Sequence, residues 1–357
     1  MKIAIIAFAN IMTSPYLANY TEEIRKTNHS CDLIYWNRKG ITESMEGIDN
    51  FFVYNRELDD GDNKLAKLPA MIGYRNFVTR IIKTEKYDVL IVLTSLLAVL
   101  LSNFVLKKYK QKYIFDIRDY SYEHFKSYKN IMKRLLSGSC LNVISSPGFL
   151  KFLPDCDCVV CHNTSFKSVG EFEFKKTQSQ INIAFIGVIR YADECEKFLY
   201  NIKNDDRITF SFYGEGMDEK RIKEFCLRNE IRNVKFYGRY DPSQKMKIYN
   251  ESDIIYNGYG NDSSSVKYAL SNKFYDCLYF KKPIIVNANT IIEEYTKDIS
   301  FVIPEKGFGA DDLVKWYVNI QPGIFNRICN DKLIKIIDEN NKFSNRLLST
   351  INNLKNE

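Results

Sequence analysis

Short apolar runs alternate with amphipathic stretches through the first half of the chain. The apolar runs are IAIIAF (3–8), CDLIYW (31–36), VLIVLT (89–94), KYIFDI (112–117), LNVISS (141–146) and CDCVVC (156–161). Between them, apolar residues recur at helical spacing in residues 16–25, in a stretch ending at Lys86, and in residues 95–109 and 126–136. Short apolar strands that alternate with helices predict a parallel sheet covered by helices on both faces.

This alternation stops in residues 164–180, which are polar, and then begins again. The second set of predicted strands is INIAFIG (181–187), ITFSFYG (208–214), NVKFYG (233–238), DIIYN (253–257) and PIIVN (283–287). An amphipathic helix is expected over residues 332–354. We therefore predict an α/β protein with two doubly wound domains, residues 1–165 and 181–330, joined by a linker at 166–180. Residues 331–357 are predicted to form a final helix.

Length and composition agree with a protein of two globular domains. The chain has 357 residues, of which 45% are hydrophobic and 27% charged, and its net charge is +7. No secretory signal precedes the nine cysteines, so we expect reduced thiols and a cytoplasmic protein. The apolar run 89–106 reaches the length of a membrane span, but polar residues interrupt it, and a strand followed by a buried helix is the preferred interpretation.

The basic residues are unevenly distributed. Residues 107–134 contain nine Lys or Arg and three acidic residues. A basic face of this kind could attract an anionic membrane surface, placing the protein peripherally at the inner face of the membrane, or it could simply be a solvated face. A nucleic-acid partner is not expected, because the basic residues are not interleaved with exposed aromatic ones.

The segment KYALSNKFYDCLYFKKPIIVN (267–287) is the most informative part of the sequence. Ser271 and Asn272 are good N-cap residues, and FYDCLYF behind them has an apolar face at helical spacing. The N-terminus of such a helix suits a phosphate, and Lys273 adds a positive charge in the first turn. Asp276 could accept hydrogen bonds from sugar hydroxyls. A nucleotide-sugar is therefore a candidate ligand, although an amphipathic helix with a solvated lysine would show the same pattern.

This segment resembles the donor-binding element of GT-B glycosyltransferases, especially the family 4-like enzymes of bacterial capsular and surface-polysaccharide biosynthesis. Those enzymes have an asparagine–lysine turn, an acidic residue, and a lysine–proline pair before an apolar strand. The matching residues here are Asn272, Lys273, Asp276, Lys282 and Pro283. The resemblance implies two Rossmann-like domains that face each other across a cleft, with the acceptor on the first domain and the donor on the second. In this fold the final helix, here residues 331–357, often crosses back to the first domain.

Further donor-binding residues are expected where the strands of the second domain end. Ligands of open α/β sheets bind beyond the carboxyl ends of the strands. Gly187 ends the first of these strands, and the resemblance implies that Arg190 holds the donor diphosphate. We also expect donor contacts from Gly214, Gly216 and Gly238, and from Ser264 and Ser265 in a flexible polar loop. Ordinary turns at strand ends would explain the three glycines equally well.

One position departs from the family pattern. Many family 4 enzymes have two glutamates on this element, separated by seven residues. Asp276 takes the second place, and Tyr268 stands eight positions earlier, where the first acid would be. In the family, this pair of acids is linked to contacts with the transferred sugar and to retention of anomeric configuration. Tyr268 in place of the first acid therefore affects what the resemblance implies about both.

The acceptor and catalytic groups are expected on the first domain. Polar residues follow the strand KYIFDI, and the family keeps acceptor-binding or catalytic groups at this place: Asp116, Arg118, Asp119, Glu123 and His124. We assign Asp116, Asp119 and His124 as catalytic, and Arg118 and Ser14 as acceptor-binding. The alternative is a salt bridge between Arg118 and an aspartate that caps the next helix, with His124 on the surface.

The cluster DCDCVVCH (155–162) could suggest a metal site. Alternation along a strand places Cys156 and Cys158 on one face and Cys161 on the other, and no second cysteine pair lies at zinc spacing. We interpret these cysteines as structural and expect neither a metal nor a cofactor.

The sequence thus predicts a metal-independent, retaining hexosyltransferase that uses a nucleotide-diphosphate sugar and a lipid-linked bacterial surface glycan or oligosaccharide acceptor. Two alternatives remain open. One is a GT-B epimerase acting on a free nucleotide-sugar, and the other is a catalytically silent subunit that binds a nucleotide-sugar or a partner glycosyltransferase.

Overall fold

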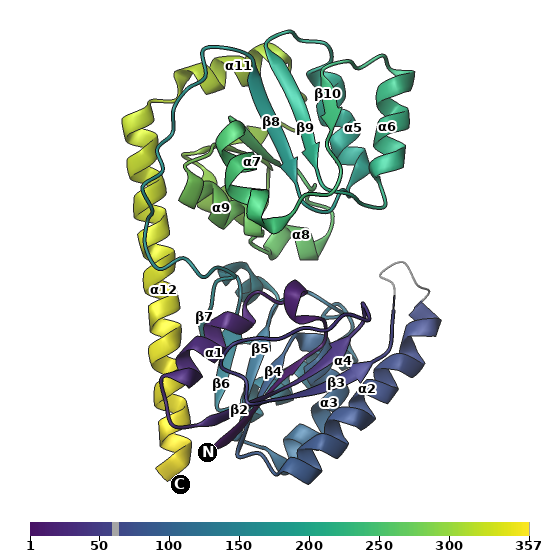
Figure 1. The fold of residues 1–357 in the computed structure, drawn as a ribbon, viewed down its shortest axis with the longest axis vertical. Coiled ribbons are helices and arrows are strands. Elements are labelled where there is room, and N and C mark those ends of the chain that lie inside the picture. The colour runs from purple at the N-terminus through teal and green to yellow at the C-terminus, as the bar shows by residue number, and fades with distance from the viewer. Residues whose placement is uncertain (59–63, 357) are drawn as a thin grey trace. The chain divides into compact units, whose positions relative to one another are not determined.

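The computed structural model describes residues 1–58 and 64–356. The chain forms two compact units. The first contains Met1–Ser165 and Asp338–Glu357, and the second contains Phe166–Ile337. The polar segment 166–180 thus belongs to the second unit (Figure 1).

A parallel seven-stranded sheet forms the centre of the first unit, in the order β3-β2-β1-β4-β5-β6-β7. Its strands are β1 (Lys2–Ala7), β2 (Ser30–Asn37), β3 (Asn50–Asn55), β4 (Val89–Leu93), β5 (Tyr113–Ile117), β6 (Leu141–Ile144) and β7 (Cys158–Val160). Its helices are α1 (Leu17–Arg25), α2 (Lys64–Glu85), α3 (Ser95–Lys108) and α4 (Lys126–Gly138), with short 3-10 turns η1 (Ile11–Thr13) and η2 (Pro147–Lys151).

Helices cover both faces of this sheet. Ile3 and Ile5 of β1 point to the face covered by α1, and Phe343 and Leu347 from the end of the chain pack against the same face. Helices α2, α3 and α4 lie against the other face (Figure 1). Central strands such as β4 and β5 are buried along their whole length, which explains their uninterrupted apolar sequences.

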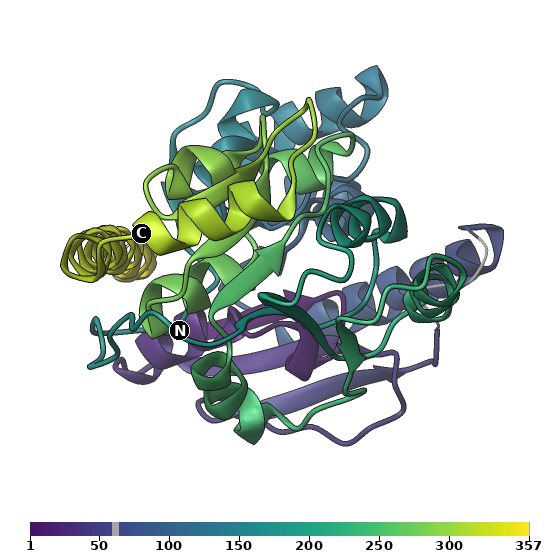
Figure 2. The ribbon, with the colours of Figure 1, turned by 90° about the horizontal axis from the view of Figure 1, so that it is seen from above.

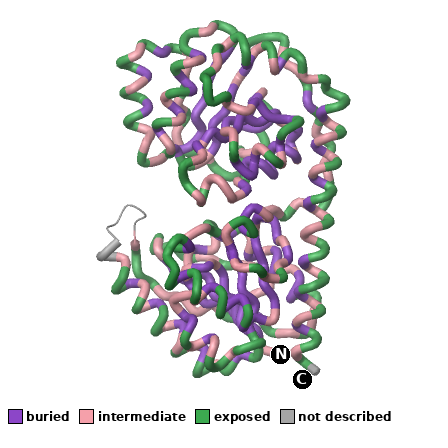
Figure 3. The backbone as a smooth tube through the Cα atoms, turned by 180° about the vertical axis from the view of Figure 1, so that it is seen from behind, coloured by how far each residue is buried: buried purple, intermediate pink, exposed green. Residues whose placement is uncertain are grey.

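The second unit contains a parallel six-stranded sheet in the order β10-β9-β8-β11-β12-β13. Its strands are β8 (Ile181–Ile186), β9 (Ile208–Tyr213), β10 (Val234–Phe236), β11 (Ile254–Asn257), β12 (Ile284–Asn287) and β13 (Ser300–Ile303). Its helices are α5 (Ala192–Asn201), α6 (Glu219–Arg228), η3 (Pro242–Gln244), α7 (Lys245–Glu251), α8 (Ser264–Tyr268), α9 (Asn272–Phe280), α10 (Ile291–Thr296) and α11 (Ala310–Asn319). The buried residues concentrate in the strands of each unit (Figure 3).

The last helix, α12 (Pro322–Asn356), contributes to both units, because its residues to Ile337 belong to the second and the following ones to the first. It is seen nearly along its axis in Figure 2. The sequence pattern placed its start ten residues later, at Lys332, because Pro322 and Gly323 look like a turn. Proline is, however, well tolerated in the first turn of a helix, where its missing N–H would have no partner.

The predicted pattern lacks the edge strands β3 and β13 and the helices α10 and α11. Strand β3 is only half-buried, so its sequence lacks a strong apolar run. In the described part of the chain, no helix is long and apolar enough to cross a membrane.

Candidate functional site

Helix α9 begins where the sequence predicts. Ser271 is the N-cap residue, and Asn272 is the first residue of the helix. The Ser271 hydroxyl does not cap the helix, because it bonds to Oδ1 of Asn257 at the end of β11, at 2.8 Å. This bond fixes the N-terminus of α9 against the carboxyl end of the sheet, where ligands of such sheets bind.

Lys273 lies in the first turn of α9 and its side chain is buried, with 8% of its surface exposed. Its ammonium nitrogen is 4.7 Å from the ring centroids of both Phe185 and Tyr259, and it donates a hydrogen bond to the Tyr259 hydroxyl. A Cβ built on Gly187 would lie 4.0 Å from this nitrogen. The structure therefore brings together the predicted donor residues Gly187 and Lys273.

The other end of α9 is stabilised by a second buried lysine. Lys281 is the C-cap residue, with a left-handed backbone (φ 54°), and its ammonium donates to the carbonyl oxygens of Leu278 at 2.8 Å and Val169 at 3.2 Å. A cation suits the negative end of a helix. Burial lowers the pKa of Lys281.

Asp276 lies one turn further along α9 than Lys273 and is nearly buried. Its Oδ1 accepts from Nζ of Lys245 at 2.6 Å, and its Oδ2 accepts from the Tyr249 hydroxyl at 3.0 Å. Burial raises the pKa of Asp276, and the charge of Lys245 opposes this shift. The Asp276 carboxylate is thus held in place by two side chains of α7.

The loops after β8 and β9 pack directly on each other. Gly214 has φ +139°, and a Cβ there would lie 1.9 Å from the carbonyl oxygen of Gly187. A Cβ on Gly216 would lie 2.0 Å from the carbonyl oxygen of Ile189. The Gly214 amide donates to the Gly238 carbonyl at 2.7 Å. The predicted glycines are therefore adjacent, and the close backbone packing is by itself sufficient to require Gly214 and Gly216.

Arg190 extends from the loop after β8. Its side chain is exposed, and its guanidinium lies 5.9 Å from the ring of Tyr191. Tyr191 is in the left-handed region (φ 68°), and its ring is 4.8 Å from that of Tyr259. Arg190 is thus connected to the Lys273 site through two tyrosine rings, and neither tyrosine was among the predicted site residues.

Ser264 and Ser265 are not in a flexible loop, and this prediction is wrong. They begin the short helix α8, with Ser263 as its N-cap residue. The Ser263 carbonyl accepts from the amides of Val266 at 3.0 Å and Lys267 at 2.8 Å. Three consecutive serines look like a loop, but serine is also a favoured residue at a helix start.

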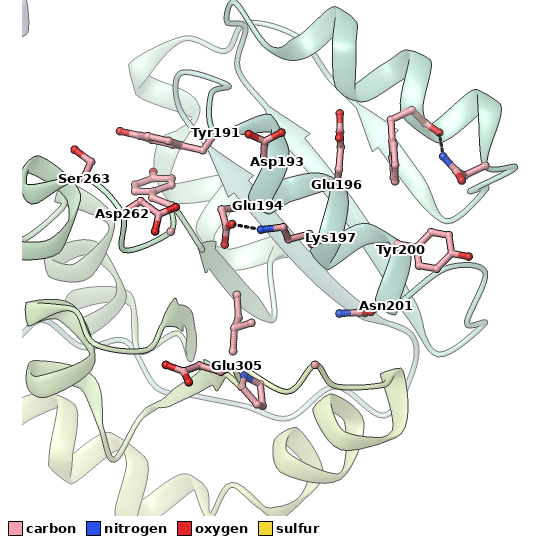
Figure 4. A pocket seen from close by; sticks show the side chains of 17 residues that line it. Tyr191, Asp193, Glu194, Glu196, Lys197, Tyr200, Asn201, Asp262, Ser263 and Glu305 are labelled. Carbon is pink, nitrogen blue, oxygen red and sulfur yellow. Dashed lines mark hydrogen bonds and ion pairs between the residues drawn. The ribbon is translucent and has the colours of Figure 1, made fainter.

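A cavity of about 860 Å³ lies beside Tyr191 and Tyr259, within the second unit. Figure 4 shows Asp193, Glu194 and Glu196 of α5 on one side and Glu305, from the segment after β13, on another. Lys197 is the basic residue among the described lining residues, and it pairs with Glu194 at 2.9 Å. Such an acidic lining repels phosphate groups and suits hydroxyls or cations.

In the first unit, Asp116 and Arg118 form a buried ion pair. Oδ2 of Asp116 accepts from Nε and Nη2 of Arg118, at 2.8 and 2.6 Å, and from the Tyr20 hydroxyl at 2.5 Å. Nη1 of Arg118 donates to the Cys161 carbonyl at 3.0 Å. These bonds join β5 to α1 and to the end of β7. These bonds favour a structural role for the pair. The salt bridge joins Arg118 to Asp116 at the end of β5 and does not cap the following helix, whereas the alternative interpretation expects such a cap.

Ser14 lies close to this ion pair. Its side chain is buried, and its hydroxyl interacts with that of Tyr16, whose ring lies 4.4 Å from the Arg118 guanidinium. Asp119 and His124 are exposed instead, and the His124 ring lies 4.1 Å from that of Phe125. The predicted acceptor residues are thus grouped at the carboxyl end of the first sheet, but of the three predicted catalytic residues only Asp119 and His124 are accessible.

The cysteine cluster is arranged as the alternation predicts. The sulfur atoms of Cys156 and Cys158 are 2.8 Å apart, and Cys161 is buried and accepts from Nδ2 of Asn19 at 3.4 Å. Among the described residues, no group of three or more His, Cys, Asp or Glu side chains is placed to hold a metal ion.

Comparison with solved structures places the whole chain in one fold. Sucrose-phosphate synthase from Thermosynechococcus elongatus matches with a TM-score of 0.69 and 9% identity, over 99% of this chain and 98% of that one. Alr3699/HepE from Anabaena, solved with UDP and glucose, matches with a TM-score of 0.66 and 12% identity, over 98% of this chain and 100% of that one. The lipopolysaccharide outer core galactosyltransferase WaaB matches with a TM-score of 0.58 and 13% identity, over 99% of each chain.

The fold is GT-B. The predicted fold class, two doubly wound Rossmann-like domains, is therefore confirmed. At these identities the similarity concerns the fold alone. No protein-family model matches the sequence, and no curated protein is similar to it.

The sequence analysis missed several residues that lie around Lys273 and Asp276. Lys245 and Tyr249 hold Asp276, Tyr259 contacts Lys273, and the Tyr191 ring packs against that of Tyr259. Tyr259 could have been found, because it stands between two glycines directly after a predicted strand. The contacts of Lys245 with Asp276 come from separate helices, and no local pattern indicates them.

Proposed function

We propose that this protein is a glycosyltransferase that binds a nucleoside-diphosphate sugar on its second unit. The observation that carries the proposal is Lys273. This cation lies at the N-terminus of α9, between the rings of Phe185 and Tyr259 and beside the loop at Gly187. Preorganised positive charge of this kind stabilises the negative charge that develops on a departing diphosphate.

The remaining roles follow from the same arrangement. Asp276 holds the donor ribose, and Arg190 reaches the diphosphate from the loop after β8. Asp119 or His124 orients or deprotonates the acceptor hydroxyl on the first unit. We extend the proposal to a metal-independent, retaining transfer to a lipid-linked bacterial surface glycan, supported by the family 4-like motif at Asn272–Pro283 and by the fold shared with WaaB.

The proposal is tested with UDP-, GDP-, dTDP- and CMP-sugars in the presence of EDTA. We expect one diphosphate donor to raise the melting temperature selectively, and that donor to release its nucleotide when a polyprenyl-diphosphate-linked saccharide is added. If no nucleotide-sugar stabilises the protein, the proposal is wrong.

A non-catalytic binding subunit is the second candidate. Tyr268 in place of the first acid of the family pair favours it. This alternative predicts donor binding without nucleotide release, whatever acceptor is supplied.

A further inference from the structure

The loop between β5 and α4 in the first unit contains buried polar groups that the protein does not satisfy. Among the described residues, Oε1 of Glu123, the hydroxyl of Tyr128 and Oγ1 of Thr94 are buried without a hydrogen-bond partner. The side chains of Glu123 and Tyr128 are only 6% and 8% exposed. Most buried polar groups in proteins have a partner, so each exception needs an explanation.

These groups come from three elements that meet at the carboxyl ends of neighbouring strands. Thr94 follows β4 and Tyr128 lies in the first turn of α4. Oε2 of Glu123 accepts from the Ser121 amide at 2.6 Å, and the Ser121 hydroxyl is 3.0 Å from that of Ser95. The loop is therefore anchored to the start of α3 on one side of Glu123, while Oε1 is buried without a hydrogen-bond partner.

The pKa shifts show that these groups share one environment. Burial raises the pKa of Tyr128, the nearby Ser95 hydroxyl opposes the shift, and the charge of Glu123 adds to it. Burial also raises the pKa of Glu123. A carboxylate that is kept buried with one free oxygen destabilises the fold unless something binds to it.

Exposed aromatic rings lie next to this cluster. Tyr122 and Phe125 are 36% and 54% exposed. The Tyr122 ring is 5.9 Å from that of Tyr128 and 6.3 Å from that of Phe125. Sites for small molecules typically combine such aromatic surfaces with a few fixed polar groups.

A pyranose ring has the chemistry that matches this combination. Its C–H face packs on aromatic rings, and its hydroxyls both donate and accept. An ionised Glu123 accepts only, whereas the hydroxyls of Tyr128 and Thr94 do both. A phosphate is unsuitable, because Glu123 and the exposed Asp119 carboxylate would repel it.

We propose that Glu123, Tyr128 and Thr94 form a subsite for a sugar hydroxyl, with the sugar ring packed on Tyr122 and Phe125. Identifying this sugar as part of the acceptor rests on the proposed function. Binding of the sugar itself does not. In this arrangement Oε1 of Glu123 accepts the hydroxyl hydrogen, and the Tyr128 hydroxyl donates to the sugar oxygen.

The test compares Tyr128→Phe with Tyr113→Phe in the full-length protein. Tyr113 is also buried in the first unit, but its hydroxyl donates to the Leu135 carbonyl at 2.5 Å. Removing an unpartnered hydroxyl should raise the melting temperature by about 2–4 °C, and removing a partnered one should lower it by a similar amount. A lower melting temperature for Tyr128→Phe would show that its hydroxyl is satisfied internally, and would overturn the proposal.

Sugar binding is measured by saturation-transfer NMR with the methyl glycosides of glucose, galactose, mannose and N-acetylglucosamine. We expect at least one glycoside to bind the wild-type protein and Tyr113→Phe. Its affinity should fall at least about tenfold in Tyr128→Phe and in Glu123→Gln. No binding to the wild-type protein, or equal binding to all variants, would refute the subsite.

Nucleotide-sugar binding separates this proposal from the proposed function. The donor-dependent rise in melting temperature should be the same in Tyr128→Phe as in the wild-type protein. If a glycoside binds but no nucleotide-sugar does, the proposed function fails and the subsite stands. If a nucleotide-sugar binds but no glycoside does, the subsite fails alone.

Discussion

Replacing Lys273 with Met should separate donor binding from folding. Methionine keeps the length of the buried chain and its packing between Phe185 and Tyr259, and it removes the charge. A hydrogen bond to a charged group contributes about 1.5–3 kcal/mol. Loss of the ammonium's bond to the diphosphate should therefore raise the donor Kd about 10- to 150-fold.

The same substitution should change the stability of the fold little. Loss of the two ring contacts costs about 0.5–2 kcal/mol each. Two gains oppose this cost. The variant no longer buries a desolvated cation, and it no longer has a positive charge at the positive end of a helix. Removing the charge from the helix end contributes about 0.3–1 kcal/mol by itself. We expect the free energy of unfolding to change by about 1 kcal/mol or less.

Lys281→Met is the matched control, because it removes a buried ammonium from the opposite end of the same helix. That ammonium bonds to backbone carbonyls, so its loss should lower stability by about 1–3 kcal/mol and leave the donor Kd unchanged. Calorimetric titration with the donor and urea unfolding measure the two quantities. A Kd within twofold of wild type for Lys273→Met would refute the assignment of Lys273 to the diphosphate.

Three further outcomes follow from the structure. Gly214→Ala should destabilise the second unit by about 2–4 kcal/mol in urea unfolding, because its Cβ would meet the Gly187 carbonyl oxygen at 1.9 Å. The control is Gly323→Ala, which should be neutral or stabilising because the space around Gly323 is open. Equal effects of the two substitutions would contradict this reasoning. Burial raises the pKa of Glu123 in the folded state. The free energy of unfolding of the wild type, relative to that of Glu123→Gln, should therefore fall as the pH rises above about 4.3, the ordinary pKa of glutamate. If urea unfolding shows the same difference between the two proteins from pH 4 to 8, the carboxyl is not desolvated. Asp276→Asn should weaken binding of a ribonucleotide donor about tenfold and its 2′-deoxy analogue less, as measured by titration, and an equal loss for both would exclude a ribose contact.

Much of the fold could be predicted because its local and global patterns agree. The start of α9 at Asn272 follows from a serine N-cap before an apolar face at helical spacing, and its end follows from Lys281 and Pro283. The elements that escaped prediction lack such agreement. The edge strand β3 is half-buried and so has no strong apolar run, and Pro322 at the start of α12 has the appearance of a turn.

The candidate site was less predictable, because its groups come from separate elements. The sequence indicated Lys273 and Asp276 as candidates chiefly through the resemblance of one segment to a donor-binding element. It allowed a salt bridge between Arg118 and an aspartate, but it could not show that Lys245 of α7 would reach Asp276. These contacts depend on side-chain directions and on which strands are neighbours in the sheet.

The polar residues differ in how far the protein itself satisfies them, and this difference separates structural roles from functional ones. Lys281 at the negative end of α9 is stabilised where it stands, and Asp116 pairs with Arg118 through Oδ2, while its Oδ1 is buried without a hydrogen-bond partner. Lys273 lies at the end of the helix that disfavours a cation, and Glu123 retains an unpartnered buried oxygen. Natural sequences depart from local stability chiefly at functional sites. By this criterion Lys273 and Glu123 are functional candidates, and Lys281 is part of the framework of the second unit.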